Sequence, residues 1–384
     1  MFIPKSGEHY AFHTMVKPTG SQCNIDCGYC FYLHKQILLD QPASPRMSDT
    51  VLKAHIRQYI EAQTVGEVVF TWQGGEPTLA GLDFYRRAVA LQQQYAKPGQ
   101  SILNDIQTNG LLLNDEWCAF FKEHGFLVGL SIDGPPQLHN RLRQTKNGKP
   151  TYPYVERAVG LLHRYGIPFN ALCVVNRINA AQPLAVYRFL RDTVRPRMIQ
   201  FLAAVEPVNF KQQAPQHRGG RYLPIRQVVL HTDNPHRHLV TDWTVSARQW
   251  GNFLAAVWQE WLKHDFGRVF VDQFENTLSQ ALGYGAQKCT TAPICGKALA
   301  IEHNGDLYAC DHFVYPQYQL GNILHEHQGS LAFGQRQEQF AYAKQTLLPR
   351  YCQTCDHLQW CWGECPKNRF VLSPEGEPGL NYLA

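Results

Sequence analysis

Three cysteines lie close together near the start of the chain: Cys23, Cys27 and Cys30. They follow residues 10–16, which are typical of a β-strand, so all three would share one tight loop. Cysteine thiolate is the usual protein ligand of iron–sulfur clusters, and three thiolates can hold three irons of a cubic [4Fe–4S] cluster. The fourth iron would keep an open coordination position, as a reactive metal site requires. A zinc knuckle is the alternative, although zinc sites favour paired C-x2-C units and four ligands.

The last third of the chain holds seven of the twelve cysteines. They are Cys289, Cys295, Cys310, Cys352, Cys355, Cys361 and Cys365. The final four have the spacing C-x2-C-x5-C-x3-C, which a zinc ribbon or an iron–sulfur site could use. Many cysteines without a recognisable signal peptide argue against a disulfide scaffold and favour metal binding or catalysis. We therefore expect reduced thiols and a cytoplasmic location. Cys118 and Cys173 fit none of these groups, and we interpret them as small buried hydrophobic residues.

Composition limits the classes of protein that fit. The chain has 384 residues, of which 44% are hydrophobic, enough for one large domain or for two. The net charge of +5 is small for this length and gives no reason to expect nucleic-acid binding. No apolar run approaches the roughly 18 residues of a membrane span, so we expect no membrane association.

Strands and helices alternate regularly over the first half of the chain. The predicted strands are residues 10–16, 68–72, 102–107, 127–132, 169–175 and 198–202, and the predicted helices are residues 48–63, 83–95, 115–124, 154–165 and 183–192. About six βα units predict a parallel sheet covered by helices. Polar and glycine-containing motifs follow several of these strands, and active sites of parallel α/β folds lie at that end of the sheet.

The alternation stops after residue 209. Residues 210–243 are rich in Gln, His, Arg and Pro, with a short apolar run at 228–230, so we interpret residues 210–245 as an insertion or linker. This divides the chain into an α/β domain (1–209) and a cysteine-rich domain (246–384). A helix is predicted from 246 to 264. Its aromatic and aliphatic stripe, which includes Trp250, Leu254 and Trp261, is interpreted as packing.

A glycine turn, Gln73-Gly74-Gly75-Glu76-Pro77, follows the strand at 68–72. Two glycines allow the backbone to approach a ligand closely, and exposed carbonyls can accept hydrogen bonds from an ammonium group. An ordinary turn is the alternative. The cysteine loop and this turn together resemble the radical S-adenosylmethionine (SAM) superfamily. The resemblance implies a partial (βα)6 TIM-like barrel in which the open iron binds the amino and carboxylate groups of SAM.

The same resemblance implies further cofactor contacts. They are Tyr29 beside the cysteines, Gly75 to the SAM amino group, Ser131 to the ribose, Arg143 to the carboxylate and Leu202 to the adenine. Arginine suits a carboxylate because its donors form a planar fork. The alternatives are a helix-capping serine, a solvated arginine and a core leucine.

The later cysteines resemble the SPASM domain, which binds auxiliary [4Fe–4S] clusters. The resemblance implies one cluster held by Cys289, Cys295, Cys310 and Cys365, and another held by Cys352, Cys355 and Cys361. It also implies a further cysteine after residues 381–383, where Ala384 stands. We expect either that the chain is truncated or that the second auxiliary cluster is labile or uses another ligand.

A closer resemblance, to the anaerobic sulfatase-maturating enzymes, rests on residues 27–32, 73–79, 107–110, 131–135 and 308–312. It implies oxidation of a Ser or Cys side chain in an unfolded or nascent sulfatase polypeptide to Cα-formylglycine. Asp311 would be the catalytic base, with His312 as the rival, and flavodoxin or ferredoxin would donate electrons. Two alternatives stay open. One is a SPASM enzyme that forms thioether or carbon–carbon links in a peptide, and the other is a non-enzymatic zinc or iron–sulfur interaction protein.

Overall fold

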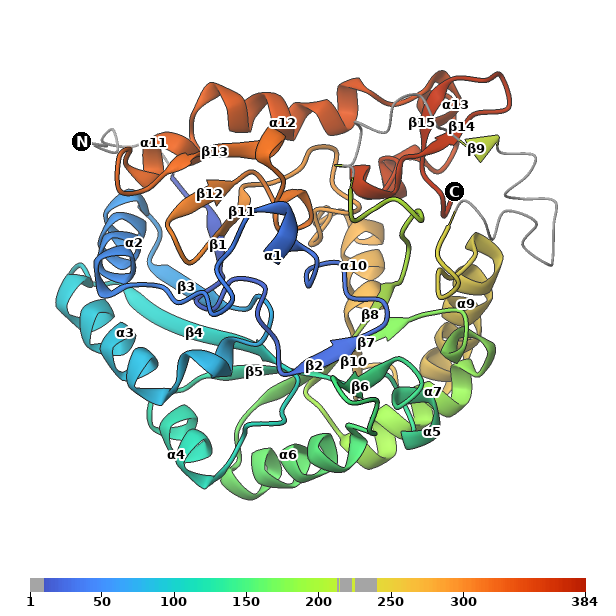
Figure 1. Cartoon of the computed structure of the whole chain (residues 1–384). Helices are drawn as coiled ribbons and strands as arrows, with labels where there is room; N and C mark the ends of the chain where they lie inside the picture. The colour runs from blue at the N-terminus through green and yellow to red at the C-terminus, as the bar shows by residue number, and fades with distance from the viewer. Residues whose placement is uncertain (1–9, 213, 215–222, 225–239) are drawn as a thin grey trace.

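The computed structural model describes residues 10–212, 214, 223–224 and 240–384. Six parallel strands form the centre of the molecule in chain order. They are β1 (His13–Val16), β3 (Glu67–Trp72), β4 (Ser101–Thr108), β5 (Leu127–Ser131), β7 (Phe169–Val175) and β8 (Met198–Ala203). Figure 1 shows these strands arranged in a curve with helices on its outer side. The six predicted strands and their parallel arrangement are confirmed.

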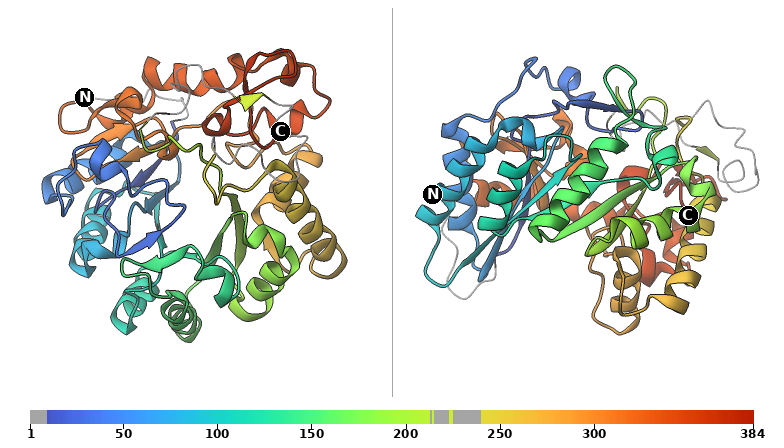
Figure 2. Two further views of the ribbon diagram at one scale, coloured as in Figure 1. Left: turned by 45° about the vertical axis from the view of Figure 1, so that its right-hand side comes forward. Right: turned by 90° about the horizontal axis from the view of Figure 1, so that it is seen from below.

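Helices connect these strands and cover the outer face of the sheet, as the cyan and green segments of Figure 2 show. They are α2 (Asp49–Ala62), α3 (Leu82–Tyr95), α4 (Asp115–Glu123), α6 (Tyr152–Tyr165) and α7 (Pro183–Phe189), the last continued by a π-helical turn, Leu190–Val194. Ser48 caps α2, since its side chain accepts a hydrogen bond from the Val51 N–H (3.3 Å). The predicted helices therefore form, with ends shifted by a few residues.

The C-terminal third extends the same sheet at both edges. On one side β10 (Phe270–Val271) pairs in parallel with β8, and on the other β11 (Ala298–Ile301) pairs in parallel with β1. Two antiparallel strands follow β11, namely β12 (Asp306–Tyr308) and β13 (Gln319–Asn322). Helix α9 (Ala247–His264) packs on α7, and α10 (Asp272–Ala281) contacts β8. The predicted domain limits remain predictions, but the parallel sheet does not end at residue 209.

Short elements complete the chain around this sheet. They are β2 (Ile25–Cys27), α1 (Lys35–Leu38), α5 (Pro136–His139), β6 (Arg143–Thr145), α11 (Gln328–Ala332), α12 (Gln335–Thr346), α13 (Arg350–Gln353), α14 (Leu358–Cys361), β14 (Val371–Leu372) and β15 (Pro378–Leu380). Two residues of the predicted insertion form β9 (Leu223–Pro224), which pairs with β14. Most of that insertion, including the apolar run at 228–230, lies outside the described residues. Within the described chain, no helix is both long and apolar enough to cross a membrane.

The burial of the strands shows where the functional space lies. In β7, buried residues alternate with partly exposed ones along the whole strand. The buried set packs under the helices, as Ala171 and Cys173 do, whereas Leu172 and Val174 of the other set line a cavity. Because successive side chains of a strand point to opposite faces, the inner face of the sheet surrounds this cavity. The barrel interior is therefore not filled by its own core.

Candidate active site

One cavity of about 510 Å³ brings together most of the residues predicted to act. Its lining includes Cys23, Cys27, Tyr29, Cys30, Gly75, Ser131, Arg143, Leu202, Asp311 and Cys365. These residues come from segments far apart in the chain, so the fold brings the cysteine loop, the glycine turn and the predicted base to one cavity. Their individual roles stay predictions.

The cysteine loop is held against the barrel by a short antiparallel ladder. Strand β2 pairs with β6, with Cys27 opposite Arg143, and the Gly28 N–H donates to the Leu142 carbonyl (2.8 Å). Arg143 Nη1 lies 3.9 Å from Cys27 Sγ, and Asn109 Nδ2 lies 3.7 Å from Cys23 Sγ. Two N–H donors thus face sulfur atoms, and hydrogen bonds of this kind tune iron–sulfur clusters.

The glycine turn fits tightly against the segment that precedes Cys23. The Gly75 N–H donates to the Gly20 carbonyl (2.9 Å) and the Glu76 N–H to the Gln22 carbonyl (2.8 Å). A Cβ built on Gly75 would lie 2.0 Å from the carbonyl oxygen of Gln22, so only glycine fits there. Because the Gly75 N–H already donates to Gly20, the backbone group of Gly75 that can bind a ligand is its carbonyl. This carbonyl is the group predicted to accept a hydrogen bond from an ammonium.

Glu76 fixes the turn to the end of β4. Its buried carboxylate accepts hydrogen bonds from Thr108 Oγ1 (2.8 Å), the Asn109 N–H (2.8 Å) and the Thr78 N–H (3.1 Å). Burial raises the pKa of this carboxyl group above its ordinary value. Asn109 in turn donates to Asn24 in the cysteine loop (2.7 Å), so Glu76 links three segments that border the cavity.

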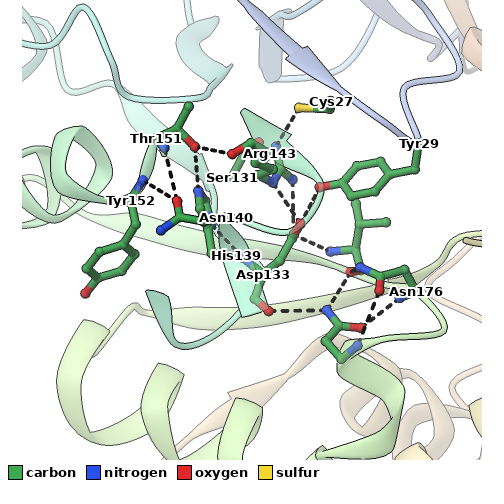
Figure 3. Close-up of polar contacts among 12 residues, drawn as sticks. Cys27, Tyr29, Ser131, Asp133, His139, Asn140, Arg143, Thr151, Tyr152 and Asn176 are labelled. Atoms are coloured by element: carbon green, nitrogen blue, oxygen red, sulfur yellow. Dashed lines mark hydrogen bonds and ion pairs between the residues drawn. The ribbon is translucent and has the colours of Figure 1, made fainter. Parts of the chain in front are cut away.

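Arg143 is engaged differently from the predicted contact to SAM. Its Nε and Nη2 form a fork on the two carboxylate oxygens of Asp133 (2.9 and 3.2 Å), and the Tyr29 hydroxyl donates to the same carboxylate. Figure 3 shows Tyr29 and Arg143 converging on Asp133. The guanidinium also stacks over the Tyr29 ring at 5.3 Å. Only the Nη1 side of Arg143 remains for a ligand, and it faces Cys27.

Ser131 and Leu202 both lie at carboxyl ends of strands, as predicted. Ser131 Oγ accepts a hydrogen bond from Gln107 Nε2 (2.9 Å), so it does not cap a helix there. The Leu202 side chain is 41% exposed and lines the cavity, which separates it from the buried core. An exposed leucine on the cavity wall is suited to packing against a flat apolar group.

Asp311 lines the cavity and forms a buried ion pair. Its Oδ1 accepts a hydrogen bond from Lys17 Nζ, and Lys17 also lies 4.5 Å from the centre of the Tyr32 ring. The rival base His312 contacts Cys365 (Nδ1 to Sγ, 3.9 Å) and Phe31. Burial, together with the positive charge of the nearby Lys367, lowers the pKa of His312, so its imidazole is neutral near pH 7.

Electrostatic interactions among the C-terminal cysteines form two sets, and the assignment of these cysteines to two clusters stays a prediction. Electrostatic interactions link Cys310 with Cys365 and Cys289, and Cys295 with Cys289 and Cys365. A separate set links Cys352 with Cys361 and Cys355. Thiolate is the usual protein ligand of iron–sulfur clusters, so the donor chemistry of each set fits an auxiliary site. Cys118 and Cys173 are fully buried in the barrel, as predicted.

Burial differs among the ten thiols that would bind clusters: Cys352 is buried, six others are partly buried, and Cys289, Cys355 and Cys361 are exposed. Burial raises the pKa of Cys27 to about 12 and those of Cys295 and Cys352 to about 11. All twelve cysteines are free of disulfides. In the described chain, no three His, Cys, Asp or Glu side chains are placed to hold a single metal ion.

Sequence reasoning missed several residues that line the cavity. Lys17 follows β1 directly, and its place after a strand was the available signal. Trp250 and Leu254 were interpreted as packing, yet both line the cavity, while Trp261 of the same helix is fully buried as predicted. The ion pair between Lys367 and Glu206 (2.7 Å) also borders the cavity and joins residues far apart in sequence.

The fold and these residues define a class of enzyme. Residues 18–190 match the radical SAM superfamily, and residues 289–356 match SPASM, an iron–sulfur cluster-binding domain. The cysteine loop, glycine turn and C-terminal cysteines described above lie within or next to the two matched regions.

Relatives place the chain more narrowly. A serine-type anaerobic sulfatase-maturating enzyme of Bacteroides thetaiotaomicron is 43% identical over 97% of this chain and 86% of its own length. A cysteine-type enzyme of Clostridium perfringens is 29% identical over 96% of this chain and 92% of its own. The solved structure of native anSMEcpe with bound AdoMet and Cp18Cys peptide matches with a TM-score of 0.81 at 28% identity, covering 97% of this chain and 93% of that one. The chain belongs to the anaerobic sulfatase-maturating enzymes. The predicted fold class, family and SAM-dependent iron–sulfur chemistry are confirmed.

Proposed function

We propose that this enzyme oxidises a serine or cysteine side chain of a sulfatase polypeptide to Cα-formylglycine, with Asp311 as the base. The observation that carries the proposal is that Asp311 and the Cys23/Cys27/Cys30 loop line the same cavity. The anSMEcpe structure, which is similar over nearly the whole chain, contains both AdoMet and a peptide. A cavity of about 510 Å³ has room for the reacting ends of both ligands.

The cofactors supply the radical and electron chemistry. When bound, SAM and its cluster would supply the one-electron chemistry that removes a Cβ hydrogen from the substrate, and the auxiliary clusters would supply an electron acceptor. Cys23, Cys27 and Cys30 would hold the first cluster. Cys289, Cys295, Cys310 and Cys365 would hold one auxiliary cluster, and Cys352, Cys355 and Cys361 would be ligands of the other.

The residues of the chain then have separate tasks. Gly75 would bind the SAM amino group through its carbonyl, Ser131 the ribose and Leu202 the adenine, while Arg143 and Tyr29 border the carboxylate end. Asp311 would accept the proton of the substrate hydroxyl or thiol, which must leave as the carbon–oxygen or carbon–sulfur double bond forms. The neutral imidazole of His312 is the alternative base, but it faces Cys365, a predicted ligand.

The proposal has three further parts. The sulfatase substrate is unfolded or nascent, an electron donor such as flavodoxin or ferredoxin serves the enzyme, and the enzyme is cytoplasmic. The first is supported by the peptide in the related structure. The last is supported by twelve cysteines that are all free thiols.

The test is an anaerobic assay of the reconstituted enzyme with matched sulfatase peptides that contain serine or cysteine at the target position. Asp311→Asn should still release 5′-deoxyadenosine but form no aldehyde. Full aldehyde yield by this variant would remove Asp311 as the base, and His312→Gln then becomes the variant to examine. Cleavage of SAM that survives Cys27→Ala would contradict the assignment of the first cluster.

A further inference from the structure

Lys17 is held by its backbone directly beside the cavity. Its N–H donates to the Ile301 carbonyl on the neighbouring strand β11 (2.9 Å), and its carbonyl accepts from the Gly20 N–H (3.1 Å). The side chain then passes the glycine turn, where a Cβ on Gly74 would lie 3.2 Å from Lys17 Cδ. The Gly20 carbonyl oxygen would be closer still, at 2.9 Å, so Gly74 makes room both for this lysine and for the segment that precedes the cysteine loop.

The Lys17 ammonium is buried and makes a specific pair. The side chain is 1% exposed, Nζ donates to Asp311 Oδ1, and Tyr32 covers it with its ring face at 4.5 Å. Removing an ammonium from water costs several kcal/mol unless a carboxylate compensates, so the pair requires Asp311 to stay in this orientation. The reverse also holds, because removal of Lys17 would leave Asp311 without the partner that fixes it.

Asp311 begins a short 3-10 turn, Asp311–Phe313, that follows Cys310. Lys17 holds its Oδ1, and Oδ2 has no hydrogen-bond partner among the described residues although Asp311 lines the cavity. We propose that Lys17 is a positioning residue for the oxidation: by holding Oδ1, it directs Oδ2 to the point where the substrate hydroxyl or thiol loses its proton. This inference rests on the proposed function, in which Asp311 accepts that proton.

Lys35 offers a matched control because it is a second buried lysine near the same region. Its side chain is also 1% exposed, and Nζ lies 3.1 Å from the centre of the Tyr315 ring. In the described part of the chain its ammonium has no hydrogen-bond partner, and Lys35 is not part of the cavity lining. Burial lowers the pKa of Lys35 to about 7, and Lys35 also interacts electrostatically with Asp311. Loss of Lys35 therefore changes the charge near Asp311 but leaves the hydrogen bond from Lys17 to Asp311 Oδ1 intact, so an effect confined to the Lys17 variant reports positioning.

The test compares Lys17→Met and Lys35→Met with the wild-type holoenzyme. Both variants keep an apolar stem of similar length and lose the charge. Formylglycine and 5′-deoxyadenosine are measured in the same reaction, and iron content and cluster absorbance are recorded. Lys17→Met should retain iron and 5′-deoxyadenosine release, but its ratio of formylglycine to 5′-deoxyadenosine should fall by about 10²-fold, as expected for a misplaced catalytic group. Lys35→Met should keep the wild-type ratio.

Chemical rescue separates positioning from space filling. In Lys17→Ala, propylammonium replaces the three methylenes and the ammonium that the substitution removes, whereas 1-propanol fills the space without the charge. Propylammonium should raise the ratio well above its value with 1-propanol, and equal ratios with the two compounds would overturn the inference. A wild-type ratio in Lys17→Met would overturn it as well, while leaving the proposed function intact. If the wild-type enzyme forms no aldehyde from either peptide, the proposed function fails and the inference with it.

Discussion

Gly75→Ala should disrupt the first cluster although it adds only one methyl group. The added Cβ would lie 2.0 Å from the Gln22 carbonyl oxygen and 2.5 Å from that of Ser21, whereas ordinary contacts begin at 3.4 Å. Both obstacles are backbone atoms, so no side chain can move aside. The segment around Gln22 must shift by more than 1 Å, and the next residue is the predicted ligand Cys23.

The energetic cost follows from the contacts that this shift breaks. Overpacking costs about 1–3 kcal/mol, and the two hydrogen bonds from the turn to Gly20 and Gln22 contribute about 0.5–1.5 kcal/mol each. We therefore expect Gly75→Ala to lower the free energy of unfolding by about 2–6 kcal/mol.

Urea unfolding and iron content after anaerobic reconstitution measure the two effects. Gly160→Ala is the control, because Gly160 lies inside α6 with no atom within 4 Å of an added Cβ. It should stabilise the protein by up to about 1 kcal/mol through helix propensity and keep full iron content. A Gly75→Ala protein with wild-type stability and wild-type iron would refute the steric reasoning.

Three other predictions follow from the same structure. Burial raises the pKa of Asp105, which accepts from Thr71, to about 6, so this group favours the folded state at low pH and loses that contribution as pH rises through 6. The difference in free energy of unfolding between Asp105→Asn and the wild type should therefore be more favourable to the variant at pH 8 than at pH 4, by on the order of 2 kcal/mol. Urea unfolding of both proteins at the two pH values measures it. Ser246→Ala should cost about 1 kcal/mol by removing the capping box of α9, and an unchanged unfolding midpoint would contradict that role. Leu202→Ala should weaken SAM binding about fivefold in calorimetry and leave the melting temperature unchanged, because the side chain is outside the core.

The barrel was predictable because each long strand carries its own local signal. Strand β7, for example, is a largely apolar segment that ends in two valines and lies between a helix and a polar turn. This pattern can be recognised from the sequence of the segment alone, without knowing which strands lie beside it. Strands β2, β6 and β10 have only two or three residues and exist because a partner lies beside them. A single sequence gives no sign of such pairing, so the return of the C-terminal third to both edges of the sheet was not predicted.

The residues of the candidate site also divide into those that the sequence identifies and those that only the fold reveals. The cysteines were identifiable because their ligand chemistry is tied to residue type and spacing. The partner of Asp311 was not, since Lys17 is 294 residues away and reaches it only when β1 and β11 pair. The engagement of Arg143 with Asp133 likewise depends on where β6 folds back on the cysteine loop. Trp250 shares its helical stripe with buried residues, and periodicity alone does not distinguish a cavity wall from a core.

The transfer of hydrogen from the substrate tests the central claim most directly. A serine-containing sulfatase peptide deuterated at the Cβ of the target residue is incubated anaerobically with the reconstituted enzyme, SAM and reductant. Mass spectrometry should then find deuterium in 5′-deoxyadenosine and a peptide that has lost one hydrogen isotope from carbon and one from oxygen. Unlabelled 5′-deoxyadenosine, or a peptide of unchanged mass, would contradict the account.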